Sequence, residues 1–356
     1  MESMGLNNFW KNKKVLITGH TGFKGGWLSL WLNSLGAEVT GYSLSPITTP
    51  SLFETARIKD ITNSHIGDIR DVEKFQRIFL DCNPEIVFHM AAQPLVRESY
   101  INPHNTYSVN VMGLVNTLEN VRKSNMVKAF VNVTSDKCYE NKEWLWGYRE
   151  NEPMGGRDPY SSSKACSEII TAAYRDSYFN SKISNTFIAS ARAGNVIGGG
   201  DWSQDRLIPD LFRAINENKI LQIRNPHSIR PWQHTLEPLF GYIKLAENLF
   251  KNGHNFAEAW NFGPNENEFK SVGWIVDYIF KYLKHSNQWD FQEDKKFHEA
   301  HYLKLDSSKA KNLLDWSPKW TLNEALQKTC DWNNAFLQNK DMQAFSLNQI
   351  KEYLAA

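Results

Sequence analysis

The stretch GHTGFKGGW, residues 19–27, follows the apolar run VLIT and precedes a helical pattern that begins WLSLWLNSLG. It places Gly19, Gly22 and Gly25 at the turn between a predicted strand and a predicted helix. Glycines at such a turn let the backbone approach a pyrophosphate closely, and the helix N-terminus offers N–H donors and the positive end of its dipole. The stretch therefore predicts a dinucleotide-binding turn, with helix–strand packing alone as the alternative reading.

Strand and helix patterns alternate through the first half of the chain. We expect strands at residues 13–19, 37–44, 85–92, 128–135 and 185–193, a further strand just before GDIRD, and helices at 23–35, 71–81, 105–124 and 159–178. Apolar strands that alternate with helices are typical of a parallel sheet covered on both faces. The fold class is therefore α/β, with a Rossmann-type doubly wound parallel sheet.

The pattern changes after about residue 193, where loops rich in glycine, proline and asparagine begin. Helices are expected there near residues 205–218, 235–251, 271–284 and 321–337. We expect a dinucleotide-binding domain over residues 1–193 and a smaller C-terminal substrate-binding lobe over 194–356, with some interleaving between them.

Composition excludes several classes of protein. The 356 residues include 40 basic and 39 acidic side chains, so the formal net charge of +1 favours neither nucleic acid nor an anionic membrane surface as a partner. No apolar run approaches the roughly 20 residues that span a bilayer, and the first residues lack the apolar core of a signal peptide. The four cysteines are widely spaced, which indicates neither disulfides nor a metal site. We expect a cytoplasmic protein that acts on a small molecule.

The second and third predicted strands bear on the choice of dinucleotide. An acidic residue usually ends the second strand and binds the adenosine ribose, but this sequence has Ser43 there. The next arginine is Arg57, too far along the chain to argue for a 2′-phosphate, so we expect NAD rather than NADP. Asp68 is expected either to accept a hydrogen bond from the adenine amino group or to cap the following helix.

The segment YSSSK places Tyr160 and Lys164 four residues apart on a predicted helix, and therefore on one helical face. A tyrosine hydroxyl titrates near ~10 when free, and a neighbouring ammonium favours its phenolate. Such a tyrosine can take the proton from a sugar hydroxyl while hydride leaves the carbon. The pair alone is weak support for an enzyme, but together with the glycine turn it indicates a dehydrogenase-type site.

These motifs resemble the extended short-chain dehydrogenase/reductases and, within them, the nucleotide-sugar 4,6-dehydratases. The matching segments are GHTGFKG, MAAQ, VTSDK, YSSSK and RAGNVIGGGDW. GGGDWSQDRLIPD and IRNPHSIRPWQHTLEPL resemble the members that act on CDP-glucose. The resemblance implies NAD as cofactor, CDP-glucose as substrate, a role in deoxysugar biosynthesis for lipopolysaccharide O-antigen, and a homodimer built on the helices near 105–123 and 159–178.

The resemblance also implies roles for the catalytic residues. Tyr160 removes the proton from the sugar C4 hydroxyl, and Lys164 holds the nicotinamide ribose. Ser135 donates to the C4 oxygen, and Asp136 is the acid that protonates the leaving C6 hydroxyl. Lys137 stands where the more common dehydratases have a glutamate that takes the C5 proton. It is expected to be that base, or else to pair with Asp136 or a diphosphate.

Two further sets of residues follow from the same resemblance. The expected cofactor-binding residues are Gly19, Thr21, Gly22, Phe23, Lys24, Gly25, Ser43, Asp68, Ile69, Ala91, Ala92, Tyr160 and Lys164. The expected substrate-binding residues are Gln93, Asn195, Arg206, Leu207, Arg230 and Gln233. Arginines are suited to bidentate contacts with phosphate oxygens, although a surface arginine or a turn asparagine is the alternative for each.

Three functions therefore stay open. The first is a 4,6-dehydratase, acting on CDP-glucose or on another nucleotide sugar. The second is a nucleotide-sugar 4-epimerase, which uses the tyrosine–lysine pair but needs no acid such as Asp136. The third is a non-catalytic NAD-binding regulator, and the presence of Ser135, Asp136, Tyr160 and Lys164 together argues against it.

Overall fold

The computed structural model describes residues 8–180, 183–286, 288–292 and 302–356. Its centre is a seven-stranded sheet in the order β11-β6-β5-β4-β1-β2-β3, in which each strand runs parallel to its neighbours. The strands are β1 (Lys14–Thr18), β2 (Glu38–Ser43), β3 (Asn63–Ile66), β4 (Ile86–His89), β5 (Ala129–Val133), β6 (Phe187–Ala193) and β11 (Ala259–Phe262). The predicted α/β class with a doubly wound parallel sheet is confirmed.

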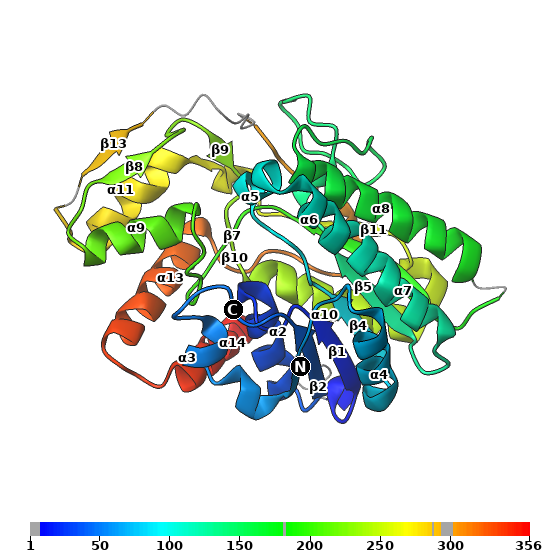
Figure 1. Cartoon of the computed structure of the whole chain (residues 1–356). Coiled ribbons are helices and arrows are strands. Elements are labelled where there is room, and N and C mark those ends of the chain that lie inside the picture. Colours follow the sequence, from blue (N-terminus) through cyan, green and yellow to red (C-terminus); the bar gives the residue numbers. More distant parts are fainter. Residues whose placement is uncertain (1–7, 181–182, 287, 293–301) are drawn as a thin grey trace.

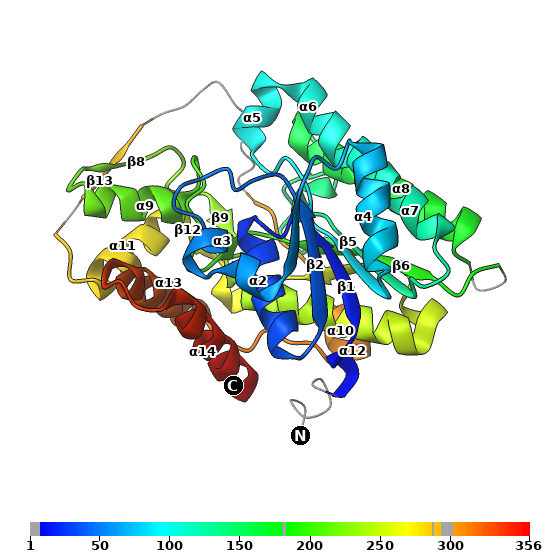
Figure 2. The same ribbon diagram turned by 60° about the horizontal axis from the view of Figure 1, so that its bottom comes forward.

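Helices cover both faces of this sheet, as Figures 1 and 2 show. One face carries α4 (Val72–Cys82), α7 (Gly113–Lys123) and α8 (Pro159–Tyr178), and the other carries α2 (Phe23–Ser34) and α10 (Leu236–Asn252). The strand order reverses between β1 and β4, where the connections leave toward opposite edges of the sheet. In such sheets the ligand crevice lies at the carboxyl ends of the strands at this switch point. The glycine-rich turn follows β1 at that place.

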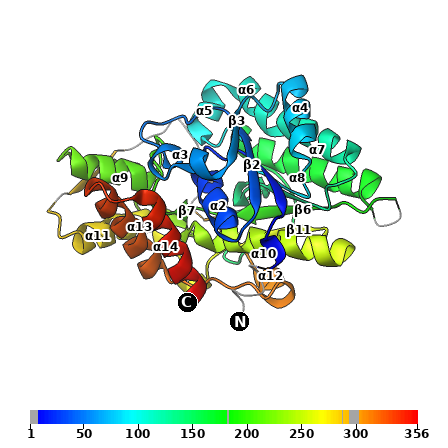
Figure 3. The ribbon, with the colours of Figure 1, turned by 90° about the horizontal axis from the view of Figure 1, so that it is seen from below.

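The C-terminal helix α14 (Met342–Ala355), which the sequence analysis did not predict, packs against α2. Figure 3 shows it beside α2 and α13 (Leu322–Leu337). Trp31 of α2 stacks on Phe240 at 5.9 Å between ring centroids and meets Tyr353 of α14 edge-on at 5.5 Å. All three rings are buried, so the chain's last helix completes the core around the helix of the glycine turn.

The smaller lobe lies at the left of Figure 1 and is built largely from residues beyond 193. Its helices α9 (Leu207–Asn216), α11 (Val272–Tyr282) and α13 agree with the expected ones to within two residues at each end. They share one apolar core with β8 (Leu221–Ile223), which pairs in parallel with β13 (Trp289–Phe291). Residues beyond 193 also supply β11 and α10 to the main sheet layer.

Short elements connect these parts. They are β7 (Val196–Ile197) paired with β10 (Gln233–His234), β9 (Ile229–Arg230) paired with β12 (Lys270–Ser271), the helices α3 (Leu52–Thr55), α5 (Val96–Ile101), α6 (Pro103–Tyr107) and α12 (Ser308–Leu313), and 3-10 turns at Ile58–Ile61, Asp136–Cys138, Gly253–Phe256 and Glu266–Glu268. None of the helices in the described residues is long and apolar enough to cross a bilayer.

The long helix expected over residues 105–124 is interrupted by a π-helical turn at Ser108–Met112. Within this turn Asn110 accepts from the Gln93 backbone N–H at 2.8 Å, donates to the Gln93 carbonyl at 3.1 Å, and donates to Ser163 of α8 at 2.8 Å. Such turns place one side chain where regular α-helix would not. Here the turn ties the loop after β4 to the helix that carries the tyrosine–lysine pair.

Candidate active site

The three glycines of the turn serve different purposes. Gly19 has a left-handed φ of +84°, and a β-carbon there would lie 2.8 Å from the Ala91 backbone nitrogen. A β-carbon at Gly25 would lie 2.1 Å from the Gly19 carbonyl oxygen, so both positions require glycine for the turn itself. At Gly22 the nearest atom would be 3.4 Å away, an ordinary contact. Packing therefore explains Gly19 and Gly25, but not Gly22.

Gly22 is the N-cap of α2, and no side chain caps this helix. The residue is exposed and carries no β-carbon, so no side chain at the N-cap covers the first turn of α2. This arrangement fits an anionic group at the helix N-terminus. Thr21, Phe23 and Lys24, which the sequence analysis named as cofactor-binding candidates, flank the position.

Ser43 ends β2 beside this turn. Its hydroxyl lies 2.8 Å from that of Thr21, and Thr21 donates its own proton to the Leu44 carbonyl at 2.8 Å. Ser43 is therefore the donor between the two hydroxyls, and its oxygen is left to accept from a ligand. A neutral serine attracts a ribose hydroxyl less strongly than a carboxylate does.

Asp68 follows β3, and Arg70 binds its carboxylate in a bidentate pair at 2.9 and 2.6 Å. These hydrogen bonds lower the pKa of Asp68. The alternative role for Asp68, capping the next helix, is wrong, because Asp71 caps α4 through the Lys74 N–H. Of the other expected cofactor residues, Ile69 packs close to Gly113 and Ala91 lies against Gly19, while Ala92 stands next in the loop after β4.

The segment after β5 forms the next part of the site. Ser135 caps the 3-10 turn: its hydroxyl accepts from the Lys137 N–H at 3.2 Å and donates to Asp136 Oδ1 at 3.0 Å. Asp136 is 2% exposed, and its Oδ2 has no hydrogen-bond partner among the described residues. A β-carbon at Gly194 would lie 2.9 Å from this oxygen, so glycine leaves room for it.

Burial raises the pKa of Asp136, although Lys137, Ser135 and Arg230 oppose the shift. Burial makes such a carboxyl group easier to protonate than an exposed one, and its free oxygen can present the proton to a ligand. The arrangement suits a general acid. Lys137 itself is partly buried next to this group.

Tyr160 and Lys164 lie on α8, which begins with Asp158 as N-cap and Pro159 as its first residue. Burial raises the pKa of Tyr160 to about 12, while a hydrogen bond with Ser135 works in the opposite direction. Lys164 donates to the Val133 carbonyl at 3.2 Å, and burial lowers its pKa to about 8. The structure thus brings Ser135, Tyr160 and Lys164 together as the motifs indicate.

Lys24 also reaches this centre, which the sequence analysis did not anticipate. Its ammonium donates to the Tyr242 hydroxyl at 3.0 Å. Burial, together with the charges of Lys164 and Arg206, lowers the pKa of Lys24 to about 7. The first turn of α2 therefore brings a second lysine toward the catalytic pair.

The expected substrate-binding residues divide into two groups. Arg206 stands just before Leu207 at the start of α9 and pairs with Asp201 at 2.9 Å. Its charge acts to lower the pKa of Tyr160. The charge of Arg230 acts to lower the pKa of Asp136. The half-exposed Asn195 side chain has no hydrogen-bond partner among the described residues. These residues border the catalytic centre with groups suited to phosphate oxygens.

The two glutamines differ from this pattern. The Gln93 amide donates to Thr106 at 2.9 Å and to the Leu95 carbonyl at 3.0 Å, and it accepts from the Leu95 N–H. Gln233 donates to the Phe262 carbonyl at 2.9 Å, and its Oε1 has no partner in the described part of the chain. The structure therefore uses the Gln93 side chain to shape its loop, while Gln233 keeps a free acceptor.

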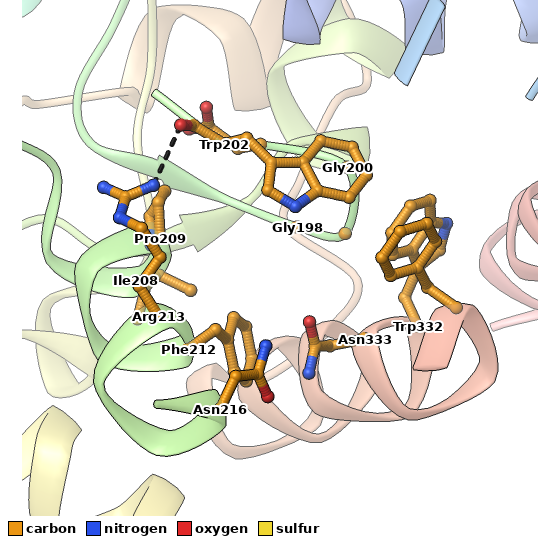
Figure 4. Close-up of a pocket in the computed structure, with 13 residues that line it drawn as sticks. Gly198, Gly200, Trp202, Ile208, Pro209, Phe212, Arg213, Asn216, Trp332 and Asn333 are labelled. Carbon is orange, nitrogen blue, oxygen red and sulfur yellow. Dashed lines mark hydrogen bonds between the residues drawn. The ribbon is translucent and has the colours of Figure 1, made fainter. Parts of the chain in front are cut away.

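A hollow of about 440 Å³, including its open mouth, lies between the 198–202 loop, α9 and α13 (Figure 4). Trp202, Phe212 and Trp332 line it, and Arg213 donates to the Trp202 carbonyl at 3.0 Å. Its lining includes Asp201, the partner of Arg206. The hollow is separate from the catalytic groups of α8 and β5.

Comparison with known proteins agrees with this geometry. The family model described as GDP-mannose 4,6 dehydratase matches residues 16–329. The chain belongs to this family. A CDP-glucose 4,6-dehydratase of Salmonella typhimurium is 54% identical over 98% of both chains. Among solved structures of similar fold, the dTDP-glucose 4,6-dehydratase of Bacillus anthracis is 23% identical over 92% of this chain and 99% of its own, with a TM-score of 0.75. The UDP-glucose 4-epimerase of Thermotoga maritima is 21% identical over 91% and 99%, with a TM-score of 0.78.

For this member of the GDP-mannose 4,6-dehydratase family, the sequence analysis missed a buried ion pair beside the site. Glu168 of α8 and Arg192 of β6 lie 2.8 Å apart, and both side chains are 4% exposed. The signal was present in YSSSKACSE, where Glu168 follows Tyr160 and Lys164 at the same four-residue spacing. A carboxylate at that position on a buried helix face needs a partner, but the sequence does not name it.

Proposed function

We propose that the chain is an NAD-dependent hydro-lyase that converts CDP-D-glucose to CDP-4-dehydro-6-deoxy-D-glucose. The observation that carries the proposal is the 54% identity, over 98% of both chains, to the Salmonella typhimurium CDP-glucose 4,6-dehydratase. The catalytic groups around Asp136 and Tyr160 supply the acid and the base that this reaction needs.

The turn after β1 fits the pyrophosphate of NAD, because Gly22 leaves the uncapped N-terminus of α2 open. Ser43 is assigned to the adenosine ribose and Asp68 to the adenine amino group, which would share the Asp68 carboxylate with the three hydrogen bonds that Arg70 donates to it. NAD, when bound, accepts a hydride from the sugar C4 and returns it at C6. The related Bacillus anthracis dehydratase was solved in complex with NAD.

Removal of the C4 hydroxyl proton is assigned to Tyr160. Its high pKa without ligands reflects burial and the nearby Asp136 charge, so positive charge at the site is needed to favour the phenolate. Arg206 supplies such a charge, and we assign the same part to Lys164, one helical turn from Tyr160. Ser135, hydrogen-bonded to Tyr160, holds the C4 oxygen during proton removal.

Loss of water needs an acid at C6 and a base at C5. Asp136 is the acid, because its Oδ2 is buried, unpaired among the described residues and of raised pKa. Lys137, adjacent to it in the 3-10 turn, is the base in this proposal. Arg206, Arg230 and Asn195 hold the diphosphate and keep the sugar between these groups and Tyr160.

A 4-epimerase is the alternative, and Asp136 separates the two functions. An epimerase has no leaving hydroxyl to protonate. In an epimerase, a buried, unpaired carboxyl beside the tyrosine would lower the stability of the fold without serving the reaction. The test incubates the holoenzyme with CDP-, dTDP-, GDP- and UDP-glucose and follows the products by mass spectrometry. We expect loss of one water from CDP-glucose at the highest rate; epimerisation without water loss would refute the proposal.

We also propose a cytoplasmic homodimer that serves deoxysugar biosynthesis for lipopolysaccharide O-antigen. The helices α6, α7 and α8 lie side by side in Figure 1, and large apolar side chains are exposed on or next to them. These side chains are Ile101, Tyr107, Met112, Ile169 and Tyr178. The four free cysteines suit a reducing compartment. Light scattering in solution tests the dimer, and a monomer at micromolar concentration would contradict it.

A further inference from the structure

Three residues of α8, spaced by four, face the end of β5. Tyr160 is hydrogen-bonded to Ser135, Lys164 donates to the Val133 carbonyl at 3.2 Å, and the carboxylate of Glu168 accepts from the Thr134 hydroxyl. Residues at this spacing lie above one another on a single helix face. Three successive turns of α8 are therefore attached to the three successive residues Val133, Thr134 and Ser135 at the end of β5.

Of these three residues, Glu168 is also bonded to the neighbouring strand β6. Its Oε2 accepts from Ser190 at 2.6 Å and from Arg192 at 2.8 Å, both on β6. Arg192 in turn donates to the Tyr139 hydroxyl at 2.7 Å, just beyond the 3-10 turn. Burial raises the pKa of Glu168, but Arg192 and these hydrogen bonds outweigh it, so the group stays ionised. The carboxylate thus joins α8, β5 and β6 in one buried network.

We infer that Glu168 is a positioning residue for the proposed dehydration: it fixes the Thr134–Asp136 segment on α8 and places a buried negative charge one helical turn behind the Lys164 ammonium. The inference rests on the proposed function, because it assigns Glu168 a part in oxidation at C4. Glu168 acts through Lys164 and Thr134, and it has no assigned contact with the substrate.

The charge of Lys164 depends on what surrounds it. Four titratable groups interact electrostatically with Lys164. They are Glu168 on the same helix, Cys138 in the 3-10 turn, Lys24 on α2 and His89 at the end of β4. Burial lowers the pKa of Lys164, and Glu168 raises it more than the buried Cys138 thiol does. Removing the Glu168 charge should therefore let the ammonium lose its proton at a lower pH.

The test uses the holoenzyme and CDP-glucose in a single turnover, with NADH formation recorded against pH. In Glu168→Gln the alkaline limb of the oxidation rate should move down by about one pH unit. Glu168→Asp keeps the charge and should leave the limb near its wild-type position. Because Glu168→Gln leaves Arg192 buried without its partner, the double variant Glu168→Gln/Arg192→Gln is made in parallel; it should show the same shift.

Thr171→Val is the matched control. Thr171 is also buried on α8 and also bonds to β5, accepting from Asn132 at 2.8 Å. It lies further along α8 than Tyr160, Lys164 and Glu168. Loss of this hydrogen bond should lower the free energy of unfolding without moving the alkaline limb of the oxidation rate. In the cofactor-free proteins, amide exchange over residues 133–136 should become faster when Glu168 is neutralised and stay unchanged in the control.

The outcomes separate the two proposals. If the wild-type enzyme does not remove water from CDP-glucose, the proposed function fails. If it does, but the alkaline limb and the amide exchange of the double variant match the wild type, Glu168 is only a structural residue and the inference is overturned.

Discussion

Replacing Asp136 with asparagine should separate the two halves of the reaction. The substitution conserves volume, and the amide oxygen can still accept from Ser135 as Oδ1 does at 3.0 Å. The unpaired Oδ2 position then holds an amide, which cannot deliver a proton to the leaving C6 hydroxyl. A positioned general acid contributes roughly 10²–10⁴-fold, so elimination should slow by that factor, about 3–5 kcal/mol in barrier.

Oxidation at C4 should not slow in the same variant. Asparagine is neutral like the protonated acid, so Tyr160 keeps the surroundings that it has beside protonated Asp136, and the charge with which ionised Asp136 raises the pKa of Tyr160 is never present. NADH should therefore form at least as fast as in the wild type and then persist. Single-turnover absorbance measures NADH, and mass spectrometry of the quenched sugar measures water loss.

Asp158→Asn is the matched control for this experiment. Asp158 also raises the pKa of Tyr160, and asparagine keeps the cap of α8, whose Ser161 N–H is 2.9 Å from the side chain. The control should eliminate water at the wild-type rate. If Asp136→Asn itself eliminates within about tenfold of the wild-type rate, roughly 1.4 kcal/mol, the acid lies elsewhere and the reasoning is refuted.

Three further outcomes are expected. Ser43→Asp should tighten NAD binding by about 1 kcal/mol in titration calorimetry, because a carboxylate accepts more strongly from the ribose hydroxyls; unchanged or weaker binding would mean that Ser43 is not the ribose position. Lys137→Met should retain C4 oxidation but stop deuterium incorporation at C5 in heavy water, whereas continued incorporation would place the base elsewhere. Burial raises the pKa of Glu237 from 4.5 to about 7, so its contribution to stability is present below pH 4.5 and is lost as pH rises toward 7. The loss is at most about 3 kcal/mol, and in urea unfolding at pH 5 and 8 the Glu237→Gln variant should show a smaller difference than the wild type.

The local pattern of the sequence predicted the elements that carry the site. The helix expected at 159–178 has those bounds, because Asp158 and Pro159 give a strong start signal. The helix expected at 23–35 is found at Phe23–Ser34, since the glycine turn marks its beginning. Each of these signals lies within a few residues of the element it defines.

Features that depend on distant partners could not be predicted in the same way. The strand Ala259–Phe262 has four residues, and its place in the sheet follows from pairing with β6. The approach of Lys24 to Tyr242 joins residues 218 positions apart. The catalytic segment and α8 were each recognised by motif, but the attachment of Glu168 to Arg192 required the fold. Sequence therefore named the candidate side chains, and the structure shows which of them lie together and how they are held.

Because α14 packs on α2, the core around α2 is complete only after α14 has been synthesised. Trp31 is made early, yet its partner Tyr353 leaves the ribosome about 320 residues later. At roughly 5–20 residues per second, this interval lasts about 16–64 seconds. During that time the apolar surface of α2 that α14 later covers lacks its cover in the nascent chain. A truncation before Met342 would make that exposure permanent, so burial of the helix that begins at the glycine turn depends on synthesis of α14.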